Sequence, residues 1–124
     1  MQYHTVVPYA LALFLSACTA NLPPSTRTLQ MPTARKSDAE LVQAISKALA
    51  QAGYEIKSKD EGAGVIQAFR PSKGLFGDPN YGHRVTISVE HGAVKITAFA
   101  MEGQLGAESP ETISGEVERI IQGS

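Results

Sequence analysis

The chain has 124 residues, and its 11 Lys and Arg nearly balance its 12 Asp and Glu. This length allows for one domain of ordinary size, and the near-neutral charge argues against a general nucleic-acid binder, which usually carries a basic excess. The single cysteine excludes an internal disulfide and offers no cysteine pair for a metal ion.

An apolar stretch near the N-terminus ends at this cysteine. Ten apolar residues, Val6 to Leu15, precede Ser16-Ala17-Cys18. The stretch has the length of a signal-peptide hydrophobic region and is too short for a membrane-spanning helix, which needs about 20 residues. Residues 1–5 contain neither Lys nor Arg, although a signal peptide normally begins with positive charge.

The tetrapeptide Leu15-Ser16-Ala17-Cys18 resembles the lipobox of bacterial lipoproteins. The resemblance implies that residues 1–17 are a signal peptide and that the Cys18 thiol carries lipid in the mature protein. Thr19 follows in place of Asp, which by the sorting rule of such lipoproteins implies the outer membrane, with the domain facing the periplasm. The alternatives for Cys18 are a secretory signal cleaved without lipidation and a structural or reactive thiol.

Residues 18–36 are interpreted as the lipidated N-terminus followed by a flexible tether, because they contain three prolines and no periodicity. If flexible, the 18 residues after Cys18 have a root-mean-square span of about 23 Å. The alternative is an extended segment packed on the domain, which is predicted to occupy residues 37–124.

The domain is predicted to begin with a helix over residues 38–52. Ser37 suits the N-cap, and Glu40 three residues later completes a capping box. Gly53 suits the left-handed position that commonly follows a helix. A second helix is predicted after Ser109, with Pro110 at its first position and its end near Gly123.

Between the helices, four segments have the pattern of strands: residues 54–59, 65–70, 83–90 and 93–101. Only His91-Gly92 separates the last two, which predicts a hairpin. We therefore expect an α+β fold, a four-stranded antiparallel meander with an N-terminal and a C-terminal helix on one face. The mature domain also resembles small envelope lipoproteins of unassigned function, in its Gly53-Tyr54 step and its His83-x-Val85-x-Ile87 strand.

The sequence offers no constellation of catalytic residues. The carboxylate groups Asp60-Glu61 and Glu116-x-Glu118 are interpreted as solvated surface, His83 as a solvated strand end and His91 as a turn residue. The two histidines lie about 26 Å apart on one strand, which is too far to share a metal ion. We expect neither a catalytic, cofactor nor metal site.

The most suggestive surface element is the loop 73–82. Its glycines and proline indicate turns, while Leu75, Phe76 and Tyr81 suggest contact with a partner. The alternative is that Leu75 and Phe76 fold back over the core. Arg70, Lys73 and Arg84 flank the loop and suit anionic headgroups or a carboxylate partner.

A second candidate surface is the sheet face without helices. Phe99 and Met101 are predicted there with Lys95 and Thr97, opposite Val94 and Ile96, as an interaction or self-association surface.

The sequence thus favours a lipid-anchored periplasmic binding or accessory module of the bacterial envelope, without catalysis. Its expected partners are the membrane, through the lipid on Cys18, and an envelope protein, with no nucleic acid. A structural envelope lipoprotein without a specific ligand is the alternative, and a small enzyme is a third.

Overall fold

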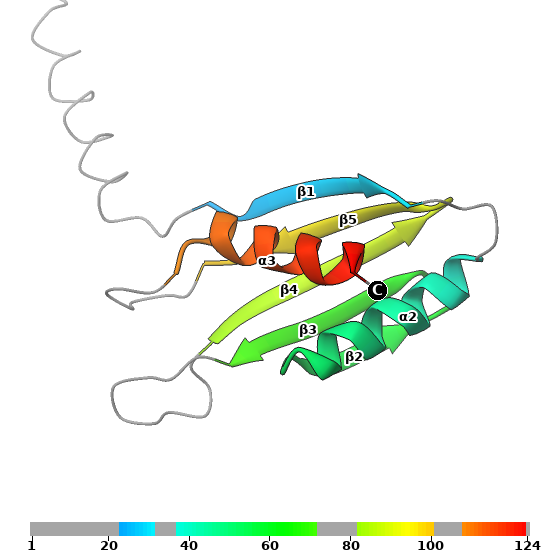
Figure 1. Cartoon of the computed structure of the whole chain (residues 1–124), viewed down its shortest axis with the longest axis horizontal. Helices are drawn as coiled ribbons and strands as arrows, with labels where there is room; N and C mark the ends of the chain where they lie inside the picture. The colour runs from blue at the N-terminus through cyan, green and yellow to red at the C-terminus, as the bar shows by residue number, and fades with distance from the viewer. Residues whose placement is uncertain (1–22, 32–36, 72–81, 101–107, 124) are drawn as a thin grey trace, which may run out of the picture.

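The structure is a computed structural model that describes residues 23–31, 37–71, 82–100 and 108–123. The predicted α+β class is confirmed (Figure 1). The elements in chain order are β1 (Ser25–Gln30), α2 (Asp38–Gln51), β2 (Glu55–Asp60), β3 (Val65–Pro71), β4 (Gly82–Glu90), β5 (Ala93–Ala98) and α3 (Pro110–Gln122).

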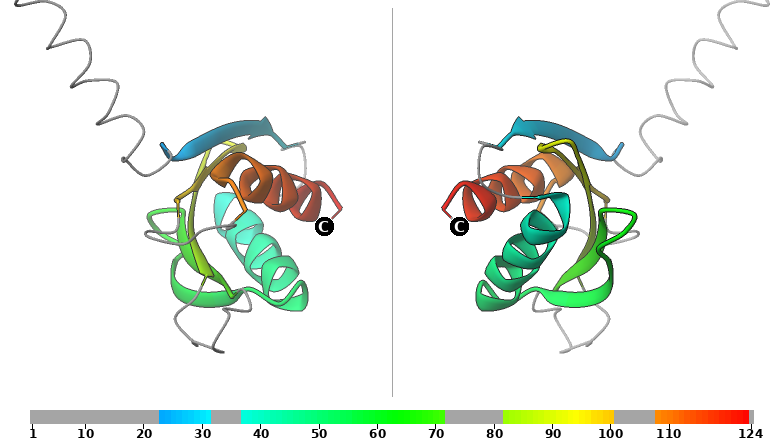
Figure 2. Two further views of the ribbon diagram at one scale, coloured as in Figure 1. Left: turned by 90° about the vertical axis from the view of Figure 1, so that its left-hand side faces the viewer. Right: turned by 90° about the vertical axis from the view of Figure 1, so that its right-hand side faces the viewer.

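The strands form one antiparallel sheet in the order β1-β5-β4-β3-β2. Strands β2 to β5 follow one another as the predicted meander, and β1 adds to the outside of β5. Both helices lie on one face of the sheet, as Figure 2 shows from its two ends. Among the described residues, no helix covers the other face, which we call the uncovered face.

The fifth strand corrects the prediction of four. Residues 18–36 were interpreted as a tether, but Ser25–Gln30 pair with β5 over six residues. For these residues the alternative of an extended, packed segment is the correct one. The hydrophobic pattern missed the strand because its inward positions carry Ser25, Arg27 and Leu29, of which only Leu29 is apolar.

Polar contacts with α3 replace apolar burial along β1. Arg27 Nε donates a hydrogen bond to Ser114 Oγ at 3.0 Å, and its Nη1 lies 2.7 Å from Glu118 Oε2. The Ser25 hydroxyl lies 2.9 Å from the same Ser114 hydroxyl. A Cβ at Gly115 would lie 3.4 Å from the Arg27 guanidinium, an ordinary van der Waals distance, so Arg27 packs closely over this part of α3.

The predicted helix signals are confirmed. The Ser37 hydroxyl accepts a hydrogen bond from the Glu40 N–H, and the Ser109 hydroxyl accepts one from the Thr112 N–H. Gly53 follows α2 with a φ of +96°. Neither helix within the described ranges is long and apolar enough to cross a membrane.

The core lies between the helices and the sheet. The two helices contribute fully buried side chains at helical spacing, and the sheet contributes those that alternate toward them. These residues are Leu41, Val42, Ile45, Leu49, Ile113, Val117 and Ile121 from the helices and Ile66, Val85, Ile87, Val94 and Ile96 from the sheet. One continuous core therefore joins β2 to β5 with both helices.

The predicted hairpin between β4 and β5 is also confirmed. His91 and Gly92 have φ values of +50° and +78°, as a type I′ turn requires. The Asp38 carboxylate accepts hydrogen bonds from both their N–H groups, at 2.9 and 3.1 Å. The first turn of α2 is thereby fixed to the hairpin.

Candidate interaction surface

The uncovered face of the sheet carries a row of three side chains from three neighbouring strands. Phe69 on β3 pairs with Arg84 on β4, and the Phe99 N–H, just beyond β5, donates to the Arg84 carbonyl at 3.0 Å. We call Phe69, Arg84 and Phe99 the Phe–Arg row. Neighbouring strands lie about 4.8 Å apart, so the two phenylalanines flank the arginine from opposite sides.

Cations lie over both aromatic rings of this row. The Arg84 guanidinium carbon is 5.0 Å from the centre of the Phe99 ring, and Lys57 Nζ is 5.4 Å from that of Phe69. Both distances are in the range of a cation–π attraction. Lys57 also forms an ion pair of 2.9 Å with Glu55, whereas no carboxylate within the described ranges forms one with Arg84. The row thus presents an exposed positive group between two half-buried rings.

A glycine lets the Phe69 ring take its position. A Cβ built on Gly82 would lie 2.5 Å from the Phe69 ring and 2.2 Å from the Arg70 carbonyl oxygen. Both are shorter than real Cβ contacts, so only glycine allows the ring to cover β4 here. The residue that begins β4 therefore shapes the Phe–Arg row.

Apart from Val65, the next two transverse lines of the uncovered face are polar. Gln67, Thr86, Thr97 and Thr26 form one transverse line, and Val65, Ser88, Lys95 and Thr28 form the next. The prediction that Lys95, Thr97 and Phe99 share this face is confirmed, with Lys95 exposed and the other two partly exposed. The aromatic character of the face is concentrated in the Phe–Arg row.

A polar cluster lies on the opposite, helix-covered side of the same sheet end. The Glu116 carboxylate on α3 accepts hydrogen bonds from Arg70 Nε at 2.8 Å, from Arg70 Nη2 at 3.1 Å and from the Tyr54 hydroxyl at 2.7 Å. Arg70 Nη1 also lies 3.3 Å from Glu108. Glu116 was predicted to be solvated surface, which is wrong, because α3 turns it toward β2 and β3. Glu118 is likewise partly buried against Arg27.

These contacts shift the ionisation of the groups involved. Burial alone would raise the pKa of Glu116, but hydrogen bonds from Arg70 and Tyr54 outweigh it and hold that pKa below its usual value. Burial, followed by the hydrogen bond to Glu116, raises the pKa of Tyr54. The hydrogen bond to Glu116 raises the pKa of Arg70. A carboxylate held ionised in this way is a poor proton acceptor, so the cluster fixes α3 to the sheet and does not resemble a general base.

The two described histidines differ in environment. His91 lies in the hairpin turn as predicted. His83 was predicted to be a solvated strand end but is 1% exposed, and its Nδ1 donates to the Phe99 carbonyl at 3.0 Å. The prediction failed because β4 begins one residue earlier and directs this side chain toward the helices. Within the described ranges, no cluster of His, Cys, Asp or Glu is arranged to hold a metal ion.

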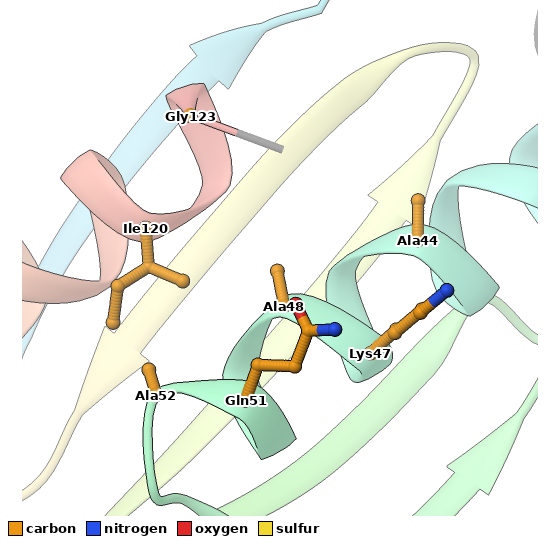
Figure 3. A pocket seen from close by; sticks show the side chains of 7 residues that line it. All are labelled: Ala44, Lys47, Ala48, Gln51, Ala52, Ile120 and Gly123. Carbon is orange, nitrogen blue, oxygen red and sulfur yellow. The ribbon is translucent and has the colours of Figure 1, made fainter.

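A shallow groove runs between the helices on the outer side of the molecule. Figure 3 shows Ile120 of α3 beside Ala48 of α2 and Ala52, which directly follows α2. The groove has a volume of about 480 Å³ and is lined by Ala44, Lys47, Ala48, Gln51, Ala52, Ile120 and Gly123. It contains one charged side chain, that of Lys47, and no convergent polar groups that would orient a ligand.

The predicted lipidation residue Cys18 and four of the candidate interaction residues, Leu75, Phe76, Tyr81 and Met101, lie outside the described ranges, as do Thr19 and Lys73. Phe99 is the predicted interaction residue that the structure places, and it lies in the Phe–Arg row. The sequence analysis did not identify Phe69 as a surface residue, because the alternation in β3 is weak. It also did not predict an aromatic neighbour for Arg84. The pairing of β3 with β4 places Phe69 beside Arg84, a relation that the sequence pattern does not contain.

Comparison with known proteins does not assign the chain to a family. The chain matches no family model, and no curated protein matches it.

Proposed function

We propose that the protein is a lipid-anchored binding or accessory module of the bacterial envelope, held at the membrane through Cys18 and acting through the uncovered face of its sheet without catalysis. The anchor is supported by the lipobox-like Leu15-Ser16-Ala17-Cys18. The single observation that carries the binding role is the Phe–Arg row, in which an exposed arginine without a carboxylate partner among the described residues lies against an aromatic ring.

Aromatic and arginine side chains favour this role on physical grounds. They are enriched among the residues that contribute most to binding energy. A monomeric protein normally covers large apolar side chains or scatters them singly, whereas here two lie in one row, on either side of Arg84 of β4. Outer-membrane location with the domain in the periplasm is part of the proposal, because Thr19 follows Cys18.

Photocrosslinking in intact cells tests the binding role. A photoreactive residue in place of Phe99 in the full-length protein is expected to give a discrete adduct. The matched control carries the same residue in place of Lys47 on the exposed side of α2, where no adduct is expected. A second probe in place of Phe69 checks the row from β3.

The result that contradicts the binding role is an absence of adducts at both Phe99 and Phe69, or the same adducts at Lys47. Either result favours the alternative, a structural envelope lipoprotein without a specific ligand. The anchor is tested separately by replacing Cys18 with Ser, which is expected to release the protein from the membrane fraction.

A further inference from the structure

The strand β1 shortens the linker between the proposed lipid and the folded domain. Six residues, 19–24, separate Cys18 from Ser25, where β1 begins. An extended chain spans at most about 3.6 Å per residue, so the seven steps from Cys18 to Ser25 reach about 25 Å at most. With β1 paired in the sheet, the start of β1 stays within this distance of the membrane surface.

The linker enters at the end of the sheet that carries the Phe–Arg row. Ser25 pairs with Ala98, the last residue of β5, and Val85 on β4 pairs with the same residue. Phe99 and Arg84 are the next residues toward that end, and Phe69 pairs with Arg84. We call this the proximal end. The distal end comprises the β4–β5 hairpin, the turn 61–64 and the start of α2 (Figure 1).

The cations of the proximal end differ in their pairing. Among the described residues there, Arg27 pairs with Glu118, Arg70 with Glu116 and Glu108, and Lys57 with Glu55. Arg84 is exposed on the uncovered face and forms no ion pair with a described carboxylate. An anionic surface therefore attracts the Phe–Arg row through a positive charge that no described carboxylate neutralises.

We propose that the Phe–Arg row binds the anionic lipid headgroups of the membrane in which the protein is anchored. A guanidinium matches the geometry of a phosphate, and phenylalanine rings are suited to the boundary between headgroups and acyl chains. The proposal rests on the proposed anchor at Cys18 and names the partner of the candidate surface. Lipid is favoured over a protein because the linker holds the row near the bilayer whether or not a protein is present.

The test compares the two ends of β3 in the lipidated, full-length protein reconstituted into vesicles. Pro71→Cys places a fluorophore at the proximal end, and Ala63→Cys places one at the distal turn, both at exposed positions. The vesicles contain phosphatidylcholine, with or without phosphatidylglycerol, and a headgroup-attached quencher. We expect stronger quenching at position 71 than at position 63, and a larger difference when phosphatidylglycerol is present.

Two substitutions on the uncovered face test the role of the row. Arg84→Gln is expected to weaken the contact between headgroups and the proximal end about fivefold, the effect of one basic residue near an anionic surface. Lys95→Gln is the matched control, because Lys95 is an exposed cation of the same face near the distal end. It should leave the quenching at position 71 unchanged.

The possible failures are distinguishable by flotation of the vesicles. If the protein floats, unlike Cys18→Ser, but both positions are quenched equally, the lipid contact is wrong and the anchor stands. If the protein does not float, the anchor fails and the lipid contact fails with it. If quenching is equal while Phe99 crosslinks to a protein in cells, the row serves a protein partner, and the proposed function survives without the lipid contact.

Discussion

The side chains of Arg70 and Glu116 join the end of β3 to the middle of α3 through two hydrogen bonds, of 2.8 and 3.1 Å. Tyr54 adds a third bond to the same carboxylate. The side chains of the ion pair are only 21% and 29% exposed, so solvent screens them less than it would a surface pair. Because the pair lies beneath the Phe–Arg row, it holds α3 against the sheet end that carries the candidate surface.

Replacing Glu116 with Gln should lower the free energy of unfolding by about 1–3 kcal/mol, because Arg70 then loses a charged acceptor in a partly buried position. Urea denaturation followed by circular dichroism measures the change. Glu90→Gln removes an exposed carboxylate at the hairpin and should change stability by less than about 0.5 kcal/mol. Equal effects of the two substitutions would show that the cluster does not stabilise the fold.

The acid side of the stability profile should depend on Glu116. Its pKa is lowered in the folded protein, so between the folded and the unfolded pKa the unfolded chain binds more protons. The contribution of Glu116 is therefore present above its ordinary pKa of about 4.3 and is lost as the pH falls through the folded value. Thermal unfolding across this range should show a flatter acid limb for Glu116→Gln than for the parent protein. Parallel acid limbs would contradict the assignment.

The loss of stability at alkaline pH should depend on Tyr54. Its pKa is raised in the folded protein, so its contribution is complete below the ordinary value of about 10 and is lost as the pH rises above it. In that range the unfolded chain releases the phenolic proton while the folded protein retains it. Tyr54→Phe should therefore reduce the alkaline loss of stability, as measured by urea denaturation at increasing pH. An equal loss of stability in Tyr54→Phe and in the parent protein as the pH rises would contradict this prediction.

The sequence predicted those parts of the fold that local patterns determine. Ser37 and Ser109 cap the helices as expected, and His91-Gly92 form the expected turn. β1 was missed because contacts with distant residues, such as that between Arg27 and Glu118, stabilise a strand with little apolar character. A polar inward-facing residue has no signature in a hydrophobic pattern, and its partner lies 91 residues away.

The candidate surface could be predicted only in part for the same reason. The alternation in β5 placed Phe99 on the uncovered face, but its relation to Arg84 depends on the pairing of β4 with β5. Phe69 joins them through a third strand. Glu116 was assigned to solvent because its own helix is amphipathic, and the position of Arg70 at the end of β3 was needed to correct that assignment.

Gly82→Ala tests whether close packing at the start of β4 shapes the Phe–Arg row. The added methyl group would meet the Arg70 carbonyl oxygen and the Phe69 ring, which forces the ring or the backbone to move. Such overpacking typically costs about 1–3 kcal/mol. Gly62→Ala is the control, because its Cβ would meet only an Asp60 carboxylate oxygen at an ordinary 3.5 Å. Chemical denaturation would measure the loss of stability, and the NMR signals of the Phe69 ring would report its displacement. Unchanged ring signals in Gly82→Ala would contradict the prediction.

The attachment of β1 should depend on Arg27. Arg27→Ala removes the hydrogen bonds to Ser114 and Glu118 while leaving the backbone ladder with β5 intact. With about 1 kcal/mol for a typical hydrogen bond, the local opening of β1 should become several-fold more frequent. Amide hydrogen exchange of β1 measures this opening, and the amides of β3 and β4 should keep the protection of the parent protein. Thr28→Ala is the control: it alters the adjacent residue, whose side chain is exposed, and it should leave exchange nearly unchanged. If β1 left the sheet, the whole segment from Cys18 to Ser37 would become linker, and the domain could move further from its anchor. Equal exchange in Arg27→Ala and Thr28→Ala would show that Arg27 does not hold β1 in the sheet and so does not set this distance.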